Sequence, residues 1–184
     1  MDDSTHELIR QSKTGNMQAF RQLVENHQTY AFNLAFRILR CEEDARDSVQ
    51  ESFIRVWRHL PKFNMKKKFT TWLYRIVVNQ ALDRLRQRKR RSEVSLSGSD
   101  SPVFPDPRPN PEESVIHAET METIQLAVDQ LPLKQRLVFI IRDLQGLGVH
   151  DVAEILKCSK QNVKSNLFHA RKNIRKQIES GENL

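Results

Sequence analysis

Residues 63–91 read FNMKKKFTTWLYRIVVNQALDRLRQRKRR and join aromatic rings, hydroxyls and an amide to a dense run of cations. Apolar residues recur at intervals of three and four, which predicts one long helix from about Thr71 to Arg90. One side of this helix holds Leu73, Ile76, Val77, Ala81 and Leu85, and the opposite side holds Trp72, Arg75, Asn79, Asp83, Arg86 and Arg90. The hydroxyl of Thr70 or Thr71 is expected to cap the first turn.

This mixture of side chains is typical of a surface that binds single-stranded nucleic acid. Aromatic faces and polar groups bind an unstacked base, while Lys and Arg follow the phosphates. A second interpretation is that Trp72 folds under the preceding loop and that the arginine run is a solvated helix end. The stretch taken alone leaves both interpretations open.

Charge is unevenly distributed along the 184 residues, whose formal net charge is +7. Residues 1–92 hold 19 Lys and Arg against 10 Asp and Glu, whereas residues 93–119 hold one against six. Residues 120–184 hold ten against seven, so two basic lobes flank an acidic tether. This pattern favours a polyanionic partner. A membrane surface is the weaker alternative, because no segment combines Lys or Arg with a lipid-facing apolar stripe.

Other composition signals exclude several classes of protein. No apolar segment of a signal peptide follows Asp2 and Asp3, and the longest apolar run, Leu137–Ile141, is far too short for membrane insertion. Cys41 and Cys158 are too far apart in sequence to indicate a disulfide framework or a CxxC site. We therefore expect a cytoplasmic protein with no metal, no cofactor and no small-molecule substrate.

Helical periodicity dominates the chain outside one segment. Apolar positions from Met17 to Leu39 predict a long helix, and those from Ala45 to Leu60 predict another that ends at Pro61. Residues 92–111, SEVSLSGSDSPVFPDPRPNP, are rich in Pro and Ser and predict an extended linker. The predicted fold class is all-α, with two small helical domains at 1–91 and 119–184 joined by a flexible acidic linker at 92–118.

Residues 147–176, LGVHDVAEILKCSKQNVKSNLFHARKNIRK, have the layout of a helix-turn-helix. The first helix faces inward with Val152, Ala153 and Leu156, and the second is anchored by Val163, Leu167 and Ile174. The turn is Lys157-Cys158-Ser159, in which Ser159 is expected to cap the second helix. The alternative is an ordinary helical hairpin with a charged outer face. A metal site at His150, Cys158 and His169 is disfavoured, because their spacing fits no common site.

Three segments in order resemble the extracytoplasmic-function, or group IV, sigma factors, the promoter-recognition subunits of bacterial RNA polymerase. They are DARDSVQESFIRVW at 44–57, FNMKKKFTTWLYRIVVN at 63–79, and the block from Leu131 to Ile174. The resemblance covers almost the whole chain, with region 2 in residues 8–91 and region 4 in about 120–178. It implies a non-enzymatic subunit that binds core polymerase, reads minus-35 and minus-10 elements, and initiates melting.

The resemblance also assigns roles to residues of this sequence. Docking on the clamp helices of the largest polymerase subunit falls to Asp44, Asp47, Gln50, Glu51 and Phe53, and region 4 is expected to bind the flap. Minus-10 binding and melting fall to Phe63, Asn64, Lys66, Lys67, Lys68, Phe69, Thr70, Trp72, Arg75, Asn79, Arg86 and Arg90. Minus-35 binding falls to Lys160, Gln161, Asn162, Lys164, Ser165, Phe168, His169 and Arg171. An anti-sigma factor is the expected regulator.

Departures from the family pattern leave the promoter sequence open. Gly148 stands where the family has a hydroxyl N-cap, and Lys157 where it often has Gly. Asn162, Asn166 and His169 replace a Thr and two Arg that are common there. The sequence leaves two other functions open: a stand-alone helix-turn-helix regulator with an N-terminal sensing or dimerising domain, and a nucleic-acid enzyme. An enzymatic function is disfavoured, because the sequence shows no nucleophile–base set and no phosphate-binding Gly loop.

Overall fold

The computed structural model describes residues 3–95 and 123–181. Every regular element in those two ranges is helical, which confirms the predicted all-α fold class. The chain divides into two compact units, Met1–Phe104 and Pro105–Leu184. The boundary between them falls inside the predicted linker, most of which lies outside the described residues.

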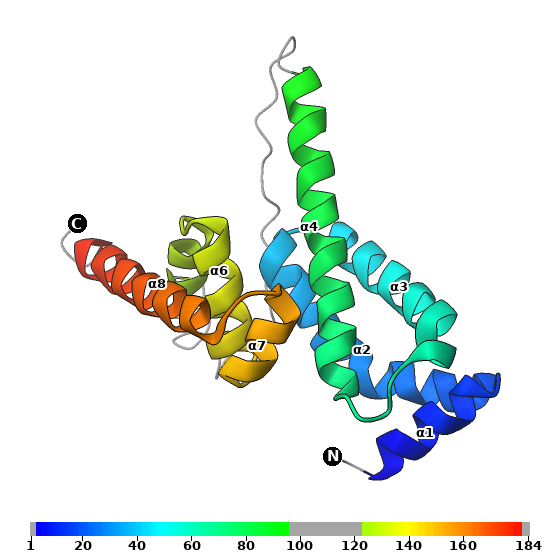
Figure 1. The fold of residues 1–184 in the computed structure, drawn as a ribbon. Coiled ribbons are helices and arrows are strands. Elements are labelled where there is room, and N and C mark those ends of the chain that lie inside the picture. Colours follow the sequence, from blue (N-terminus) through cyan, green and yellow to red (C-terminus); the bar gives the residue numbers. More distant parts are fainter. Residues whose placement is uncertain (1–2, 96–122, 182–184) are drawn as a thin grey trace, which may run out of the picture. The chain divides into compact units, whose positions relative to one another are not determined.

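The N-terminal unit is a helical bundle with α2 at its centre (Figure 1). Its elements are α1 Asp3–Lys13, α2 Met17–Leu39, α3 Glu42–His59, the 3₁₀ turn η1 Leu60–Lys62 and α4 Phe69–Ser95. Helix α2 packs against α1, α3 and α4, and α3 also packs against α4. The space between them is filled by fully buried side chains that include Ile9, Leu23, Leu34, Ile38, Leu39, Val56, Leu60, Leu73 and Val77.

Particular residues fix where the helices of this unit begin and end. The side chain of Asn16 accepts hydrogen bonds from the backbone N–H groups of Gln18 (3.0 Å) and Ala19 (3.1 Å), so it caps α2. Arg40 adopts a left-handed conformation at φ 54° and ends the same helix. Helix α3 ends at His59, and Pro61 lies in the following 3₁₀ turn, in agreement with the prediction from Pro61.

Helix α4 differs from the prediction at both ends. The backbone N–H of Trp72 donates to the Lys68 carbonyl at 3.2 Å, so Lys68 holds the cap position and the helix starts at Phe69. The expected caps, Thr70 and Thr71, lie inside the first turn, so that prediction is wrong; burial of Phe69 (2% exposed) brings the helix start forward. The helix continues to Ser95, so residues 92–95 of the predicted linker are helical.

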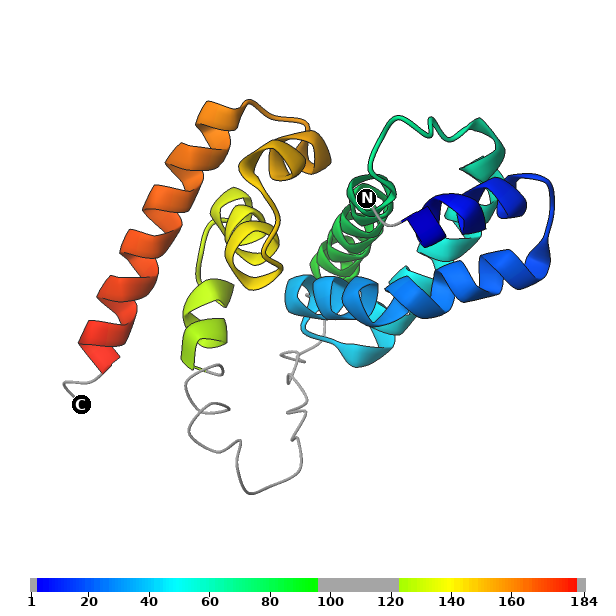
Figure 2. The same cartoon turned by 90° about the horizontal axis from the view of Figure 1, so that it is seen from below.

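The described C-terminal unit is a second helical bundle, shown from another side in Figure 2. After helical residues 123–129 come α6 Leu133–Phe139, the π-helical turn η2 Ile140–Leu144, α7 Val149–Leu156 and α8 Lys160–Gly181. Helix α8 packs against both α6 and α7. Its buried side chains are Val163, Leu167, Ala170 and Ile174, which include all three predicted anchors.

The predicted helix-turn-helix is confirmed in α7 and α8. Lys157 adopts a left-handed conformation at φ 51° in the turn, and the hydroxyl of Ser159 accepts from the Asn162 N–H at 3.1 Å. Gly148 is the N-cap of α7 and supplies no side-chain cap. The inward face of α7 uses Ile155 (2% exposed) where Leu156 was expected, because Leu156 is only half-buried.

Replacing Asn16 by Ala removes the cap of α2, the helix that contacts every other α-helix of the N-terminal unit. We expect a loss of about 1 kcal/mol in the free energy of unfolding, the usual cost of losing such a cap. Urea denaturation followed by circular dichroism measures this loss. Gln18→Ala is the matched control, because it shortens an exposed first-turn side chain but keeps the capped N–H. Equal effects of the two substitutions would contradict the capping role.

Candidate nucleic-acid interface

Three aromatic rings form a cluster at the start of α4. The ring of Phe63 lies 4.7 Å from that of Trp72 and 5.9 Å from that of Phe69, measured between centroids. Phe63 and Phe69 are buried, at 6% and 2% exposure, whereas Trp72 is half-buried. Two of the three predicted base-binding rings are therefore packed inside the cluster, where they support the surface above them.

The loop between η1 and α4 places its cations on the surface beside this cluster. Asn64 organises the loop: its side-chain oxygen accepts from the Lys66 N–H at 2.9 Å, and its carbonyl accepts from the Lys67 N–H at 3.0 Å. Lys66, Lys67 and Lys68 are all exposed. The loop is thus a tight turn that presents three adjacent positive charges.

The predicted DNA-facing residues of α4 differ in their surroundings. Asn79 and Arg90 are exposed, and Thr70 and Arg75 are half-buried. Arg86 is exposed and forms an ion pair with Asp83 at 2.7 Å, one turn away on the same helix. An exposed ion pair of this kind is worth at most about 1 kcal/mol, so Arg86 stays available to a phosphate.

The acids predicted to bind polymerase are paired with arginines of α4. Arg84 lies 2.7 Å from Asp47, and Arg88 lies 3.0 Å from Asp44. Arg88 also donates to the carbonyl of Leu39 at 3.1 Å, which ties α4 to the end of α2. A single sequence carries no signal for these contacts, because the partners are far apart in the chain.

The remaining polymerase-facing candidates of α3 divide into exposed and buried groups. Gln50 and Glu51 are exposed, and Glu51 lies 3.5 Å from Arg55. Phe53 is 7% exposed, so its ring belongs to the interior of a groove and not to the outer face of the helix.

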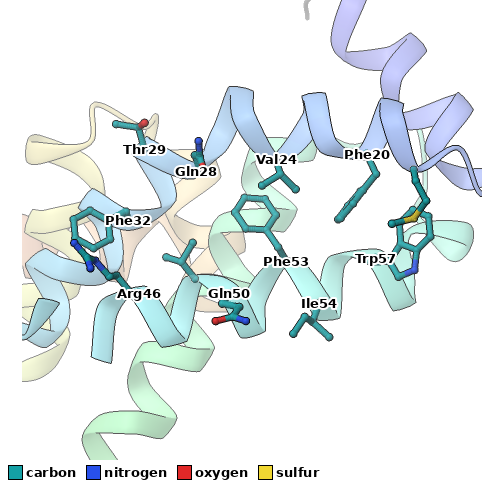
Figure 3. Close-up of a pocket in the computed structure, with 12 residues that line it drawn as sticks. Phe20, Val24, Gln28, Thr29, Phe32, Arg46, Gln50, Phe53, Ile54 and Trp57 are labelled. Atoms are coloured by element: carbon teal, nitrogen blue, oxygen red, sulfur yellow. The ribbon is translucent and has the colours of Figure 1, made fainter. Parts of the chain in front are cut away.

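That groove runs between α2 and α3 and has a volume of about 660 Å³ (Figure 3). Phe20, Val24 and Phe32 line it from α2, and Phe53 and Trp57 line it from α3. The rings of Phe20 and Trp57 lie 4.8 Å apart. At its rim Met17 and Ile54 are 64% and 37% exposed, although periodicity alone assigns Met17 to the core. The groove is thus an apolar surface that remains open to a partner.

Helix α8 presents all eight of its predicted DNA-facing residues to solvent. Exposed positions include Lys160, Gln161, Asn162, Lys164, Ser165, Phe168, His169 and Arg171. The ring of Phe168 is 65% exposed and lies 5.5 Å from that of His169. The opposite, apolar stripe is buried, so the helix has the two faces that a recognition helix requires.

Arg171 forms an ion pair with Asp143 of η2. Its guanidinium donates two hydrogen bonds of 2.8 Å to the carboxylate of Asp143 in η2. These hydrogen bonds raise the pKa of Arg171, so the side chain stays charged. The pair joins α8 to the π-helical turn, a structural role that the sequence did not predict.

His27 of α2 packs beneath the aromatic cluster, with its ring 5.2 Å from that of Phe69. Its Nε2 is buried and makes no hydrogen bond among the described residues. Burial lowers the pKa of His27 below its ordinary value, because the charged imidazolium loses its hydration. The cluster is therefore supported by a neutral imidazole at neutral pH.

Comparison with known proteins identifies the family. A family model described as "Sigma-70 region 2" matches residues 23–91, and one described as "Sigma-70, region 4" matches residues 121–174. The "ECF RNA polymerase sigma factor SigW" of Bacillus subtilis is 32% identical over 92% of this chain and 94% of its own length. The chain belongs to the ECF sigma factors. This membership excludes the stand-alone regulator that the sequence left open.

Further relatives agree with this assignment. The "RNA polymerase sigma-H factor" of Pseudomonas aeruginosa is 30% identical to this ECF sigma factor over 96% of the chain and 95% of its own length. Among solved structures, CnrH in complex with the cytosolic domain of CnrY has a TM-score of 0.72 at 22% identity, with 97% and 99% of the two chains covered. The sigma factor RpoE of Bartonella quintana, in complex with the anti-sigma factor NepR, has a TM-score of 0.73 at 21% identity, with 89% and 98% covered. These two structures support the fold.

Two further observations concern the described residues of this sigma factor. No helix within them is long and apolar enough to cross a bilayer. Within the same ranges, no three His, Cys, Asp or Glu side chains gather closely enough to hold a metal ion.

The pKa of His27 predicts a pH dependence of stability. Because the folded-state pKa lies below the unfolded value, the unfolded chain binds more protons as the pH falls through about 6.5. Stability should therefore fall in that window, and His27→Phe should make the fall shallower while it keeps an aromatic ring on Phe69. Melting temperatures of both proteins at pH 7.5, 6.5 and 5.5 measure this. Parallel curves of melting temperature against pH for the wild type and His27→Phe would refute the assignment of this pH dependence to His27.

Proposed function

We propose that this ECF sigma factor binds core RNA polymerase, directs it to promoters with minus-35 and minus-10 elements, and nucleates melting. One observation carries the proposal: each sigma-70 region exposes its own cationic surface. Region 2 exposes the loop lysines and the cations of α4, and region 4 exposes the outer face of α8. Cations on a DNA-binding surface replace counterions along the phosphates, so two such surfaces suit two promoter elements.

In region 2, the cationic loop and α4 bind the unpaired minus-10 strand. Lys66, Lys67 and Lys68 follow the phosphates, with Asn64 and Thr70 alongside. Extruding a base from the duplex costs a few kcal/mol, so a rigid receiving surface is needed to offset it. The ring cluster supports this rigidity, because Phe63 and Phe69 are already packed before DNA arrives. Trp72, Arg75 and Asn79 extend the surface along the helix, and Arg86 and Arg90 bind phosphates of the upstream duplex.

In region 4, α8 acts as the recognition helix for the minus-35 duplex. Its N-terminal residues Lys160, Gln161, Asn162, Lys164 and Ser165 face the major groove, where Lys suits guanine and Gln or Asn suits adenine. The exposed ring of Phe168 suits a thymine methyl group. His169 and Arg171 complete the surface one turn further along.

Helix α3 provides the contact with the clamp helices of the largest polymerase subunit. Asp47, Gln50 and Glu51 are exposed there and suit a basic partner. Asp44 and the buried ring of Phe53 support the same face from behind. Region 4 binds the polymerase flap.

Control by an anti-sigma factor is the regulation we infer. The RpoE relative was solved with the anti-sigma factor NepR. In this chain the open apolar groove between α2 and α3 offers a surface for apolar side chains of such a protein. We further infer that the chain acts in the cytoplasm, with no catalytic activity of its own and no cofactor.

Run-off transcription with core polymerase tests the proposal. Core enzyme alone and core enzyme with this chain are given a library of promoter sequences, and the transcripts are sequenced. We expect new start sites, preceded by a shared pair of elements, only when the chain is present. Initiation at no member of the library would refute the proposed function.

Substitution of Lys164 by Ala removes an exposed cation near the N-terminus of the proposed recognition helix. Loss of a base or phosphate contact costs about 1–3 kcal/mol, so we expect roughly a fivefold or larger drop in transcription from promoters that need the minus-35 element. Lys134→Ala is the matched control, since it removes an exposed cation of the same unit from α6. If transcription falls equally in both variants, the effect is one of net charge and the assignment of α8 as the recognition helix is wrong.

Substitution of Asn79 by Ala removes an exposed amide from the proposed minus-10 surface of α4. We expect slower promoter opening, measured by permanganate reactivity of unpaired thymines, with normal recruitment of polymerase in a filter-binding assay. Gln87→Ala serves as control, because it removes an exposed amide elsewhere on the same helix. Normal thymine reactivity in the Asn79 variant would remove this residue from the melting surface.

A further inference from the structure

A lysine of α1 contacts the base of the cationic loop. The ammonium of Lys13 donates a hydrogen bond of 2.9 Å to the carbonyl of Phe63, in a partly buried setting. Phe63 begins the segment that we assign to minus-10 DNA. We propose that Lys13 is a positioning residue for promoter melting: it holds the loop at 63–68 in the geometry that receives unpaired bases. This inference rests on the proposed function of region 2.

The end of α1 is itself well held, so Lys13 can act as a fixed anchor. Ile9, one turn earlier, is fully buried, and the hydroxyl of Ser12 donates to the Leu8 carbonyl at 2.7 Å. Immediately after α1, Asn16 caps α2. Helix α1 also contacts η1, the turn that leads into Phe63.

The Phe63 carbonyl is an effective point at which to hold the loop. A peptide group is planar, so the carbonyl of Phe63 and the N–H of Asn64 lie in one rigid plane. Phe63 has an extended conformation, with φ −65° and ψ 131°, and the chain turns away from η1 at this residue. A hydrogen bond to its carbonyl therefore restrains ψ of Phe63 and the direction in which Asn64 leaves.

The restraint is transmitted to the lysines through Asn64. Its side chain and its carbonyl accept from the N–H groups of Lys66 and Lys67, so the turn moves as one body with the Asn64 backbone. On the other side, the ring of Phe63 packs on Trp72 of α4. Lys13 and Trp72 thus hold the same residue by its main chain and by its ring. Loss of either contact should let the turn shift relative to α4.

A direct phosphate contact by Lys13 is the competing explanation. It is less suited to the geometry, because Lys13 is half-buried and its ammonium already bonds to a main-chain oxygen. Residue 13 also precedes the region 2 match at 23–91, so the family match assigns it no role. The two explanations differ in what they predict for DNA sequence preference.

Lys13→Met and Arg10→Met form a matched pair of variants in the full-length chain. Both remove one positive charge from the last turn of α1, so their effects on net charge and on the helix dipole are alike. Arg10 is highly exposed and pairs with Glu7 of its own helix, so the control leaves the loop untouched. Lys13→Arg keeps a cationic donor at position 13 and should restore the wild-type behaviour.

Amide hydrogen exchange on the free protein gives the first readout. The N–H groups of Lys66 and Lys67 donate to Asn64 within the turn, and that of Phe63 donates to the Leu60 carbonyl of η1. All three should exchange faster, by about five- to tenfold, in Lys13→Met. Exchange in α2 and α3 should not change. Faster exchange throughout the N-terminal unit, or unchanged exchange in the loop, would overturn the positioning role.

Oligonucleotide binding by holoenzyme gives the second readout. The probes are the non-template strand of a promoter selected by wild-type holoenzyme and the same strand with each minus-10 base made abasic in turn. We expect Lys13→Met to reduce the preference for the intact strand about five- to tenfold, and Arg10→Met to leave it unchanged. An equal loss of affinity for all strands would indicate a phosphate contact and overturn the proposal.

The two readouts also separate this inference from the proposed function. If holoenzyme selects no promoter, the proposed function fails, while the exchange measurement still decides whether Lys13 holds the loop. If promoters are selected and either readout fails to respond to Lys13→Met, the positioning role fails alone.

Discussion

Repulsion between the cations of α4 is the constraint that shapes the N-terminal unit. Residues 84–91 carry six positive charges on little more than two turns of helix. Acids on the neighbouring helix α3 reduce this repulsion, because Asp47 pairs with Arg84 and Asp44 with Arg88. The cations closest to the body of the domain are thereby neutralised, while those beyond them remain exposed to a polyanion. Each exposed pair contributes at most about 1 kcal/mol, so the apolar face of α4 supplies most of the attachment.

The same pairing connects two surfaces that have different proposed partners. Asp44 and Asp47 belong to α3, which we propose faces polymerase, whereas Arg84 and Arg88 belong to α4, which we propose faces DNA. A basic partner that binds the two aspartates therefore weakens their ion pairs with the arginines. A phosphate that binds the arginines weakens the same ion pairs. Because the pairs are only partly buried, breaking them costs little free energy. Docking and DNA binding are thus expected to favour one another.

The sequence predicted the parts of the molecule that depend on local periodicity and missed those that depend on distant contacts. The stripe of α8 and its Ser159 cap follow from spacing along one helix, and both were predicted. Periodicity placed Met17 on a core face, but burial also requires a covering element, and none of the described residues covers that end of the groove. The Arg171–Asp143 and Lys13–Phe63 contacts join residues 28 and 50 positions apart, for which a single sequence carries no signal.

Buried aromatic residues and exposed cations have different roles in the proposed minus-10 surface. Rings that are already packed lose little conformational freedom when DNA binds, so the cost of ordering is met during folding. The lysines keep their mobility and bind phosphates wherever the strand runs. A loop made of lysines alone would attract any polyanion, and a ring cluster alone would attract none. Selectivity for a melted promoter therefore requires that the lysine loop and the ring cluster keep a fixed relative position. The contacts to Phe63 from α1 and α4 fix that position.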